Sequence, residues 1–170
     1  MPKPCTNTIV ALALSFCFAS VQAQTAPSAA EMVEQLKAQP PRTRSLRNLT
    51  VESAAPEARP SLSLLIQFDF NSSTVKPESQ QALANLAQAL KSKELGESKF
   101  AVEGHTDGKG RADYNLKLSQ QRADAVRSFL ASNGVVDARL QAVGKGATEL
   151  ANTADPLAAV NRRVRIVNLN

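Results

Sequence analysis

Two charged residues, Arg122 and Asp107, stand where a fold can hold opposite charges close together. Residues 114–132 have helical periodicity, and a helical wheel places Arg122 inside an apolar stripe. That stripe consists of Leu118, Ala125, Val126 and Phe129. A guanidinium on a core-facing surface needs a polar partner, and Asp107 follows a strand-like run that begins at Phe100. An acid and a base at the rim of a sheet favour binding of a zwitterion.

Other polar residues are expected near this pair. Asn115 lies close to the start of the predicted helix. Arg162 shares strand parity with Val164, which assigns it to the buried face of the last strand and brings it near the pair. Arg163 should then point the opposite way, toward the surface or a structural partner. Asn161 is expected to fix a loop.

Each of these residues also has a structural interpretation. Asp107 precedes Gly108 and is equally consistent with a turn in which its carboxylate accepts backbone N–H groups. Arg122 is equally consistent with an internal ion pair to Asp107 or Glu103. His105 is the only histidine of the chain, and we expect a hydrogen-bonded framework residue there rather than a ligand.

Regular structure is predicted from residue 62 onward. Strand-like runs cover 62–70, 100–103, 139–143 and 164–169, and helical periodicity covers 77–91 and 114–132. The second helix ends at Asn133-Gly134, a common C-terminal stop. Because helices separate the strands, the order β-α-β-α-β-loop-β predicts an α+β domain. We expect a mixed four-stranded β-sheet with the helices packed on one face.

Residues 1–23 have the pattern of a secretory signal peptide. An apolar stretch over 9–19 follows a basic start, and Val21-Gln22-Ala23 supplies a small-residue cleavage pattern. Both cysteines, Cys5 and Cys17, lie inside this segment, so the mature chain would form no disulfide. Acylation of Cys17 is the less favoured alternative, because Phe16 stands where a lipoprotein signal has a small residue.

Residues 24–60, rich in Ala, Pro and Ser, are predicted to be a linker. One short amphipathic helix is expected over 29–38, with Met32, Val33 and Leu36 on the same side. Arginines interleave with leucines after this helix. A second hypothesis is therefore that residues 29–50 dock onto an outer-membrane or envelope protein partner.

The composition argues against several functional classes. The net charge of +5 comes from interspersed charges of both signs, and the chain has no Trp and one Tyr, so nucleic acid is not an expected partner. With one His and no Cys after residue 23, we expect no metal site and no cofactor. His105 and Asp107 match two thirds of a catalytic triad, but no nucleophile stands in a recognisable strained turn. We expect a binding protein rather than an enzyme.

Short motifs follow one another in a specific order across residues 62–170. They are Phe68-x-Phe70, Gly104-His105-Thr106-Asp107, Tyr114-Asn115, Leu118-Ser119, Arg122-Ala123, Gly144-x-Gly146 and Asn161-Arg162-Arg163-Val164. In this combination residues 61–170 resemble the OmpA-like C-terminal domain. The same peptidoglycan-binding module occurs in peptidoglycan-associated lipoprotein and in the flagellar stator B subunit.

The resemblance implies a periplasmic, non-catalytic domain that binds the diaminopimelate residue of Gram-negative peptidoglycan and tethers the outer membrane or an envelope complex to the wall. By position, Asp107 is expected to bind the amino or amide group of diaminopimelate and Arg122 its carboxylate. Backbone amides of Phe70 and Asn71 would help to hold a carboxylate, although many relatives have Asp where this chain has Asn71. The other residues expected to line the pocket are Asn115, Leu118 and Arg162. The sequence leaves open whether the chain forms a homodimer.

Overall fold

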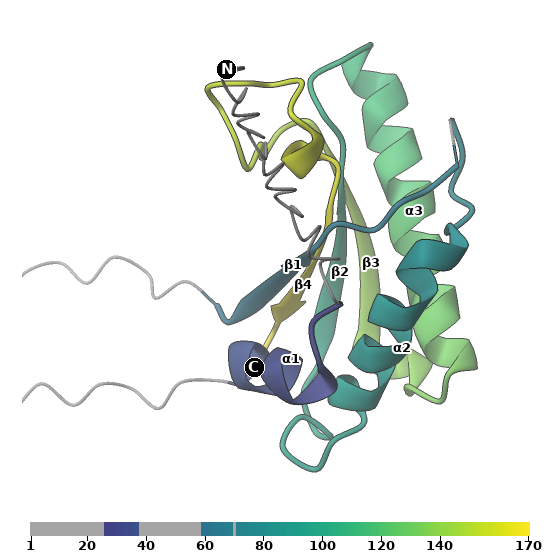
Figure 1. Ribbon diagram of the computed structural model, residues 1–170, viewed down its shortest axis with the longest axis vertical. Helices are drawn as coiled ribbons and strands as arrows, with labels where there is room; N and C mark the ends of the chain where they lie inside the picture. The colour runs from purple at the N-terminus through teal and green to yellow at the C-terminus, as the bar shows by residue number, and fades with distance from the viewer. Residues whose placement is uncertain (1–25, 38–58, 70) are drawn as a thin grey trace, which may run out of the picture.

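A four-stranded β-sheet carries α2 (Pro77–Leu90) and α3 (Ala112–Ser132) on one of its faces (Figure 1). The structure is a computed structural model that describes residues 26–37, 59–69 and 71–170. The predicted signal peptide, residues 24–25 and 38–58 of the predicted linker, and Phe70 lie outside the described residues. Within the described ranges, no helix has both the length and the hydrophobicity that crossing a membrane requires.

The sheet is mixed, as the sequence predicts. Its strands are β1 (Ser61–Leu64), β2 (Phe100–His105), β3 (Leu140–Gly146) and β4 (Val164–Asn168), in the spatial order β1-β4-β2-β3. β4 is antiparallel to both of its neighbours, whereas β2 and β3 are parallel. A parallel pair needs a long crossover connection, and α3 supplies it. β2, which leads into the loop with Asp107, and β4, which follows Arg162, are the central pair of the sheet.

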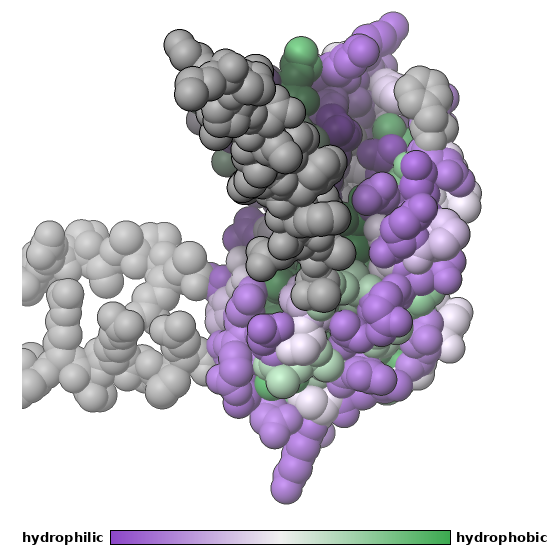
Figure 2. All heavy atoms as spheres, in the orientation of Figure 1, coloured by the Kyte–Doolittle hydropathy of each residue, from purple (hydrophilic) through white to green (hydrophobic). Residues whose placement is uncertain are grey.

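The first strand is shorter than the run of apolar residues that predicts it. β1 ends at Leu64, and the chain beyond it leaves β4 and forms a single bridge between Phe68 and Val75. α2 then begins at Pro77, where the missing N–H costs no helical hydrogen bond. Leu83 and Leu90 of α2 are fully buried in the core. The outer surface over α2 and α3 is mostly hydrophilic (Figure 2).

α3 packs closely on the sheet because two strand residues in contact with it are glycines. A Cβ on Gly104 would lie 2.2 Å from the carbonyl oxygen of Ser119, and a Cβ on Gly144 would lie 2.6 Å from the backbone nitrogen of Gln120. The hydroxyl of Ser119 also accepts a hydrogen bond of 2.9 Å from the N–H of Gly146. These contacts fix the rotation of α3 about its axis.

This rotation differs from the one that the apolar stripe predicts. The buried residues of α3 are Asn115, Ser119, Ala123, Val126 and Leu130. Arg122 is half-buried at the edge of that line, as are Leu118 and Phe129. The physical reason is the close approach at Gly104 and Gly144, which turns small side chains toward the sheet and leaves the larger ones at its margin.

A short helix before the sheet, α1 (Ala29–Leu36), is part of the folded core. It begins with a capping box in which the Glu31 carboxylate accepts a hydrogen bond of 2.8 Å from the Ser28 N–H. Met32 and Leu36 are fully buried, and the Asn168 side chain donates a hydrogen bond of 2.9 Å to the Leu36 carbonyl. The sequence places this helix in a linker or docking segment, whereas the structure uses its apolar side inside the domain.

Candidate ligand-binding site

A pocket of about 690 Å³ opens where the chain after β1, the loop after β2 and the first turns of α3 meet. All of the predicted site residues that the structure describes line it; Phe70 lies outside the described residues. The lining residues are Phe68, Asp69, Asn71, Thr106, Asp107, Lys109, Tyr114, Asn115, Leu118, Arg122, Leu157 and Arg162. The structure therefore brings together residues that the sequence separates by more than ninety positions.

Asp107 combines both of the roles that its sequence context suggests. One oxygen, Oδ1, accepts a hydrogen bond of 3.2 Å from the Lys109 N–H, as in a turn. The other, Oδ2, accepts a charge-assisted hydrogen bond of 2.8 Å from Nη1 of Arg162. The carboxylate is mostly shielded, since its side chain retains 17% of its exposure, but it still faces the pocket.

Asn115 holds the loop that carries Asp107. Its side chain is buried, and Nδ2 donates to the carbonyl of Lys109 at 3.0 Å and, more weakly, to the carbonyl of Asp107 at 3.4 Å. Because α3 is fixed against the sheet, these bonds transmit a defined position from the helix to the loop. The main contribution of Asn115 is therefore to position the acid rather than to present its own amide.

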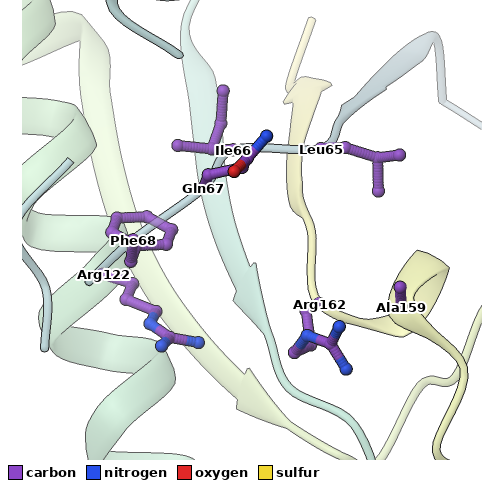
Figure 3. A pocket seen from close by; sticks show the side chains of 7 residues that line it. All are labelled: Leu65, Ile66, Gln67, Phe68, Arg122, Ala159 and Arg162. Atoms are coloured by element: carbon purple, nitrogen blue, oxygen red, sulfur yellow. The ribbon is translucent and has the colours of Figure 1, made fainter. Parts of the chain in front are cut away.

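Arg122 has no acidic partner among the described residues, so the alternative structural interpretation, an internal ion pair with Asp107 or Glu103, is wrong. Its Nε donates a hydrogen bond of 3.1 Å to the carbonyl of Ser72. Its guanidinium lies over the Phe68 ring, with Cζ 4.8 Å from the ring centroid (Figure 3). Burial lowers the pKa of Arg122 below its usual value, although the Asp107 charge acts in the opposite direction. An arginine remains protonated at neutral pH, and its terminal amino groups face the pocket.

Arg162 lines the pocket, as predicted, but it is exposed and not on a buried strand face. Arg163, predicted to point outward, is the buried one, and its Nη2 donates to the Glu149 carbonyl at 3.1 Å. The parity prediction is wrong because a short 3-10 helix, Ala159–Asn161, precedes β4, so alternation starts only at Val164. Arg162 therefore reaches outward to Asp107.

The loop-fixing role predicted for Asn161 is confirmed. Its side chain is fully buried, and Nδ2 donates to the carbonyls of Asp155 and Pro156 at 3.0 and 3.1 Å. Its Oδ1 accepts a hydrogen bond of 2.8 Å from the N–H of Asn152. A backbone bond of 2.8 Å from Gly108 to Pro156 then joins this loop to the one that carries Asp107.

The turn between β1 and α2 supplies the remaining wall. Asn71 has a φ of 54°, in the left-handed region that Asn tolerates better than most residues. This turn directs the Ser72 carbonyl toward Arg122. Six lining residues were not predicted from the sequence: Phe68, Asp69, Thr106, Lys109, Tyr114 and Leu157. Phe68, Thr106 and Tyr114 stand inside motifs that the sequence shows, whereas nothing local marks Leu157.

A second polar cluster lies beside the site, around the side chain of His105. Carboxylate oxygens of Glu103 and Glu149 and a ring nitrogen of His105 all lie within 4.8 Å of one another, as in a metal site. Cations already neutralise both carboxylates: Lys145 Nζ lies 2.9 Å from Glu149 and 3.7 Å from Glu103, and Arg165 lies 3.8 Å from each. The positive charges of Lys145 and Arg165 disfavour the binding of a metal ion here. The cluster is therefore an ion-pair network.

His105 is not the hydrogen-bonded framework residue that the sequence predicts. Its side chain is fully buried, and neither ring nitrogen has a hydrogen-bond partner among the described residues. Burial, together with the charges of Arg163, Arg165 and Lys145, lowers the pKa of His105 to about 4. The imidazole is therefore neutral at pH 7 and is buried as an uncharged ring.

Residues 67–164 of the chain match the OmpA family. Outer membrane porin F of Pseudomonas fluorescens is 42% identical over 101 residues, which are 58% of this chain and 30% of that protein. Peptidoglycan-associated lipoprotein of Brucella melitensis is 41% identical over 81 residues, which are 48% of this chain and 47% of that protein. The chain thus spans less than two thirds of the length of these curated relatives.

Solved structures are also similar to this chain, and the similarity covers a larger share of their own length. The peptidoglycan-associated lipoprotein from Burkholderia pseudomallei is 37% identical, with a TM-score of 0.53 over 62% of this chain and 88% of that chain. The cell wall anchor of the T6SS from Pseudomonas aeruginosa is 30% identical, with a TM-score of 0.54 over 65% of this chain and 81% of that chain. The fold is therefore shared with both proteins.

Proposed function

This chain belongs to the OmpA family, and from that membership and its pocket we propose that it binds peptidoglycan non-covalently through the diaminopimelate residue of the stem peptide. The free end of diaminopimelate carries an ammonium and a carboxylate on one carbon. Recognition of that end needs an acid and a base at a fixed separation. Asp107 and Arg122 line one pocket and are not paired with each other, and this single observation carries the proposal.

Arg122 would bind the carboxylate, because a guanidinium can donate two parallel hydrogen bonds to its two oxygens. Its Nε is already used by the Ser72 carbonyl, which orients the fork and leaves the two terminal amino groups for the ligand. Asp107 would accept the ammonium while it keeps Arg162 as a neighbour. A stem peptide with lysine in place of diaminopimelate lacks the carboxylate and would leave Arg122 without an anion.

The proposed activity is binding without catalysis. No histidine, serine or cysteine occurs among the described residues that line the pocket, so the lining has neither the Ser–His nor the Cys–His pair of acyl-transfer enzymes. Relatives named for peptidoglycan association and for anchoring to the cell wall support a role in tethering an envelope structure to the wall. Residues 1–23 would direct the chain to the periplasm, and N-terminal sequencing of the exported protein should then begin at Gln24.

Co-sedimentation with purified sacculi tests the proposal. The parent protein should pellet with diaminopimelate-type sacculi and not with lysine-type sacculi, while the Asp107→Ala and Arg122→Ala variants should stay in solution. Asp113→Ala and Arg127→Ala are matched controls, because both residues lie on α3 and form ion pairs outside the pocket, and both variants should pellet like the parent. A folded parent that does not pellet, or an Asp107→Ala variant that pellets equally well, overturns the assignment.

A further inference from the structure

A second pocket of about 360 Å³ adjoins the candidate site. The two pockets share Phe68, Arg122 and Arg162 as a common wall. Arg122 reaches toward it from α3, and Arg162 reaches from the segment before β4 (Figure 3). The rest of its lining consists of Leu65, Ile66, Gln67 and Ala159. Among the described residues, the second pocket is thus lined by aliphatic groups, one ring, one amide and two cations, with no acid.

Charge balance in the first pocket leaves these cations only partly compensated. Its charged lining residues are three cations, Arg122, Arg162 and Lys109, and two acids, Asp69 and Asp107. The free end of diaminopimelate carries one positive and one negative charge, so binding it changes nothing in this balance. One positive charge remains in excess in the first pocket, and two of its three cations, Arg122 and Arg162, also line the second pocket. A further anion beside Arg122 and Arg162 would neutralise it.

Hydrogen-bond donors are available at that wall. Arg162 uses Nη1 for Asp107 Oδ2, and its Nε and Nη2 have no partner within the described ranges. Within the same described ranges, Arg122 uses only its Nε, which donates a hydrogen bond to the Ser72 carbonyl. Because the terminal amino groups of Arg122 are assigned to diaminopimelate, the unused donors of Arg162 remain at the mouth of this aliphatic pocket, and they match a ligand that carries a carboxylate on a small apolar residue.

We propose that the second pocket binds the free C-terminal carboxylate of the same stem peptide, carried by the small residue that follows diaminopimelate. A stem tetrapeptide ending in D-alanine has this chemistry: its methyl group would contact Leu65 and Ala159, and its carboxylate would bind Arg162. This inference rests on the proposed function, because it needs diaminopimelate in the first pocket. It predicts that the protein prefers stems with an uncapped terminal alanine over stems whose terminal carboxylate is blocked.

The test compares a soluble diaminopimelate-containing tetrapeptide with its C-terminal amide by isothermal titration calorimetry. The amide keeps the methyl group and loses only the charge. The parent should bind the free acid about two- to fivefold more tightly than the amide, a modest factor because Arg162 is partly exposed and water screens its charge. Ala159→Leu fills the second pocket from an exposed position and should abolish this difference, so that the variant binds the free acid and the amide with equal affinity. Ala154→Leu, exposed in the same loop and lining neither pocket, should keep the difference.

The outcomes separate this inference from the proposed function. If the folded parent binds neither peptide, the proposed function itself is overturned. Equal affinity of the parent for acid and amide overturns the second subsite alone and leaves the first intact. A preference for the acid that persists in Ala159→Leu, or that disappears equally in Ala154→Leu, shows that the carboxylate is not bound in the second pocket.

Discussion

Replacement of Arg122 by alanine should separate ligand binding from folding. In the folded protein this guanidinium makes one hydrogen bond to the Ser72 carbonyl and stacks on Phe68. One hydrogen bond contributes about 1 kcal/mol and one cation–π contact about 0.5–1 kcal/mol. The free energy of unfolding should therefore fall by only about 1.5–2 kcal/mol. No buried carboxylate is left without a partner, because Asp107 keeps Arg162.

The effect on binding should be larger. A half-buried guanidinium that donates two charge-assisted hydrogen bonds to a carboxylate contributes about 3 kcal/mol in total, so Kd for a diaminopimelate-containing peptide should rise roughly 100-fold. Arg122→Lys keeps the charge and loses the planar fork, and it should lie between the parent and Arg122→Ala. Calorimetric titration of each variant, with thermal unfolding followed by circular dichroism, measures both quantities.

Arg127→Ala is the matched control for this series, because Arg127 lies on the same helix and pairs with Asp137 outside the pocket. Its binding should equal that of the parent. The reasoning is refuted if folded Arg122→Ala binds within twofold of the parent, or if Arg127→Ala loses as much affinity as Arg122→Ala does.

Three further perturbations test the framework that positions the charges. Asn115→Ala should lower the free energy of unfolding by about 1–2 kcal/mol, because it removes the hydrogen bonds to the Asp107 loop. It should also weaken peptide binding although the ionic groups remain. Unchanged affinity would contradict the positioning role of Asn115. Gly104→Ala should cost about 3 kcal/mol or more, since its Cβ would lie 2.2 Å from the Ser119 carbonyl oxygen, and a melting temperature equal to that of the parent would contradict the close packing. The depressed pKa of His105, about 4 against 6.5 in an unfolded chain, means that the unfolded state binds the proton first as pH falls. The free energy of unfolding should therefore decrease from about pH 6.5 to about pH 4, and the decrease should be shallower in His105→Gln, measured by urea titration at each pH.

The order of strands and helices could be predicted from the sequence because periodicity reports it directly. Helices that separate strands require crossovers, and the mixed sheet follows. The register of side chains beyond a strand end could not be predicted in this way. Arg162 and Arg163 exchange their expected orientations because the 3-10 helix over Ala159–Asn161 intervenes before β4. Alternation holds only within continuous strand.

Periodicity also shows that a helix has an apolar face without showing what covers it. Met32 and Leu36 predict the amphipathic helix α1 correctly, yet nothing local indicates that α2 and β1 would bury it. The apolar stripe of α3 likewise indicates an amphipathic helix without showing how the helix is rotated on the sheet, so it predicts a more central position for Arg122 than the structure has. The sheet residues that rotate α3, Gly104 and Gly144, are remote in sequence, and their effect depends on the absence of side chains.

The framework and the charged groups of the site are held by different interactions, and this division explains why the two can be varied separately. Asn115 and Asn161 are buried amides that hold the two loops by bonds to backbone carbonyls, and the Gly108–Pro156 backbone bond joins those loops. Arg122 and Arg162 extend from this framework into the pocket with most of their donors unused in the part of the chain that the structure describes. Removal of an asparagine leaves loop carbonyls without their donors and frees the loops that carry the site, whereas removal of a guanidinium leaves both loops in place. Substitutions at Arg122 or Arg162 should therefore weaken anion binding in a pocket that keeps its shape, and substitutions at Asn115 or Asn161 should weaken binding by displacing the loops.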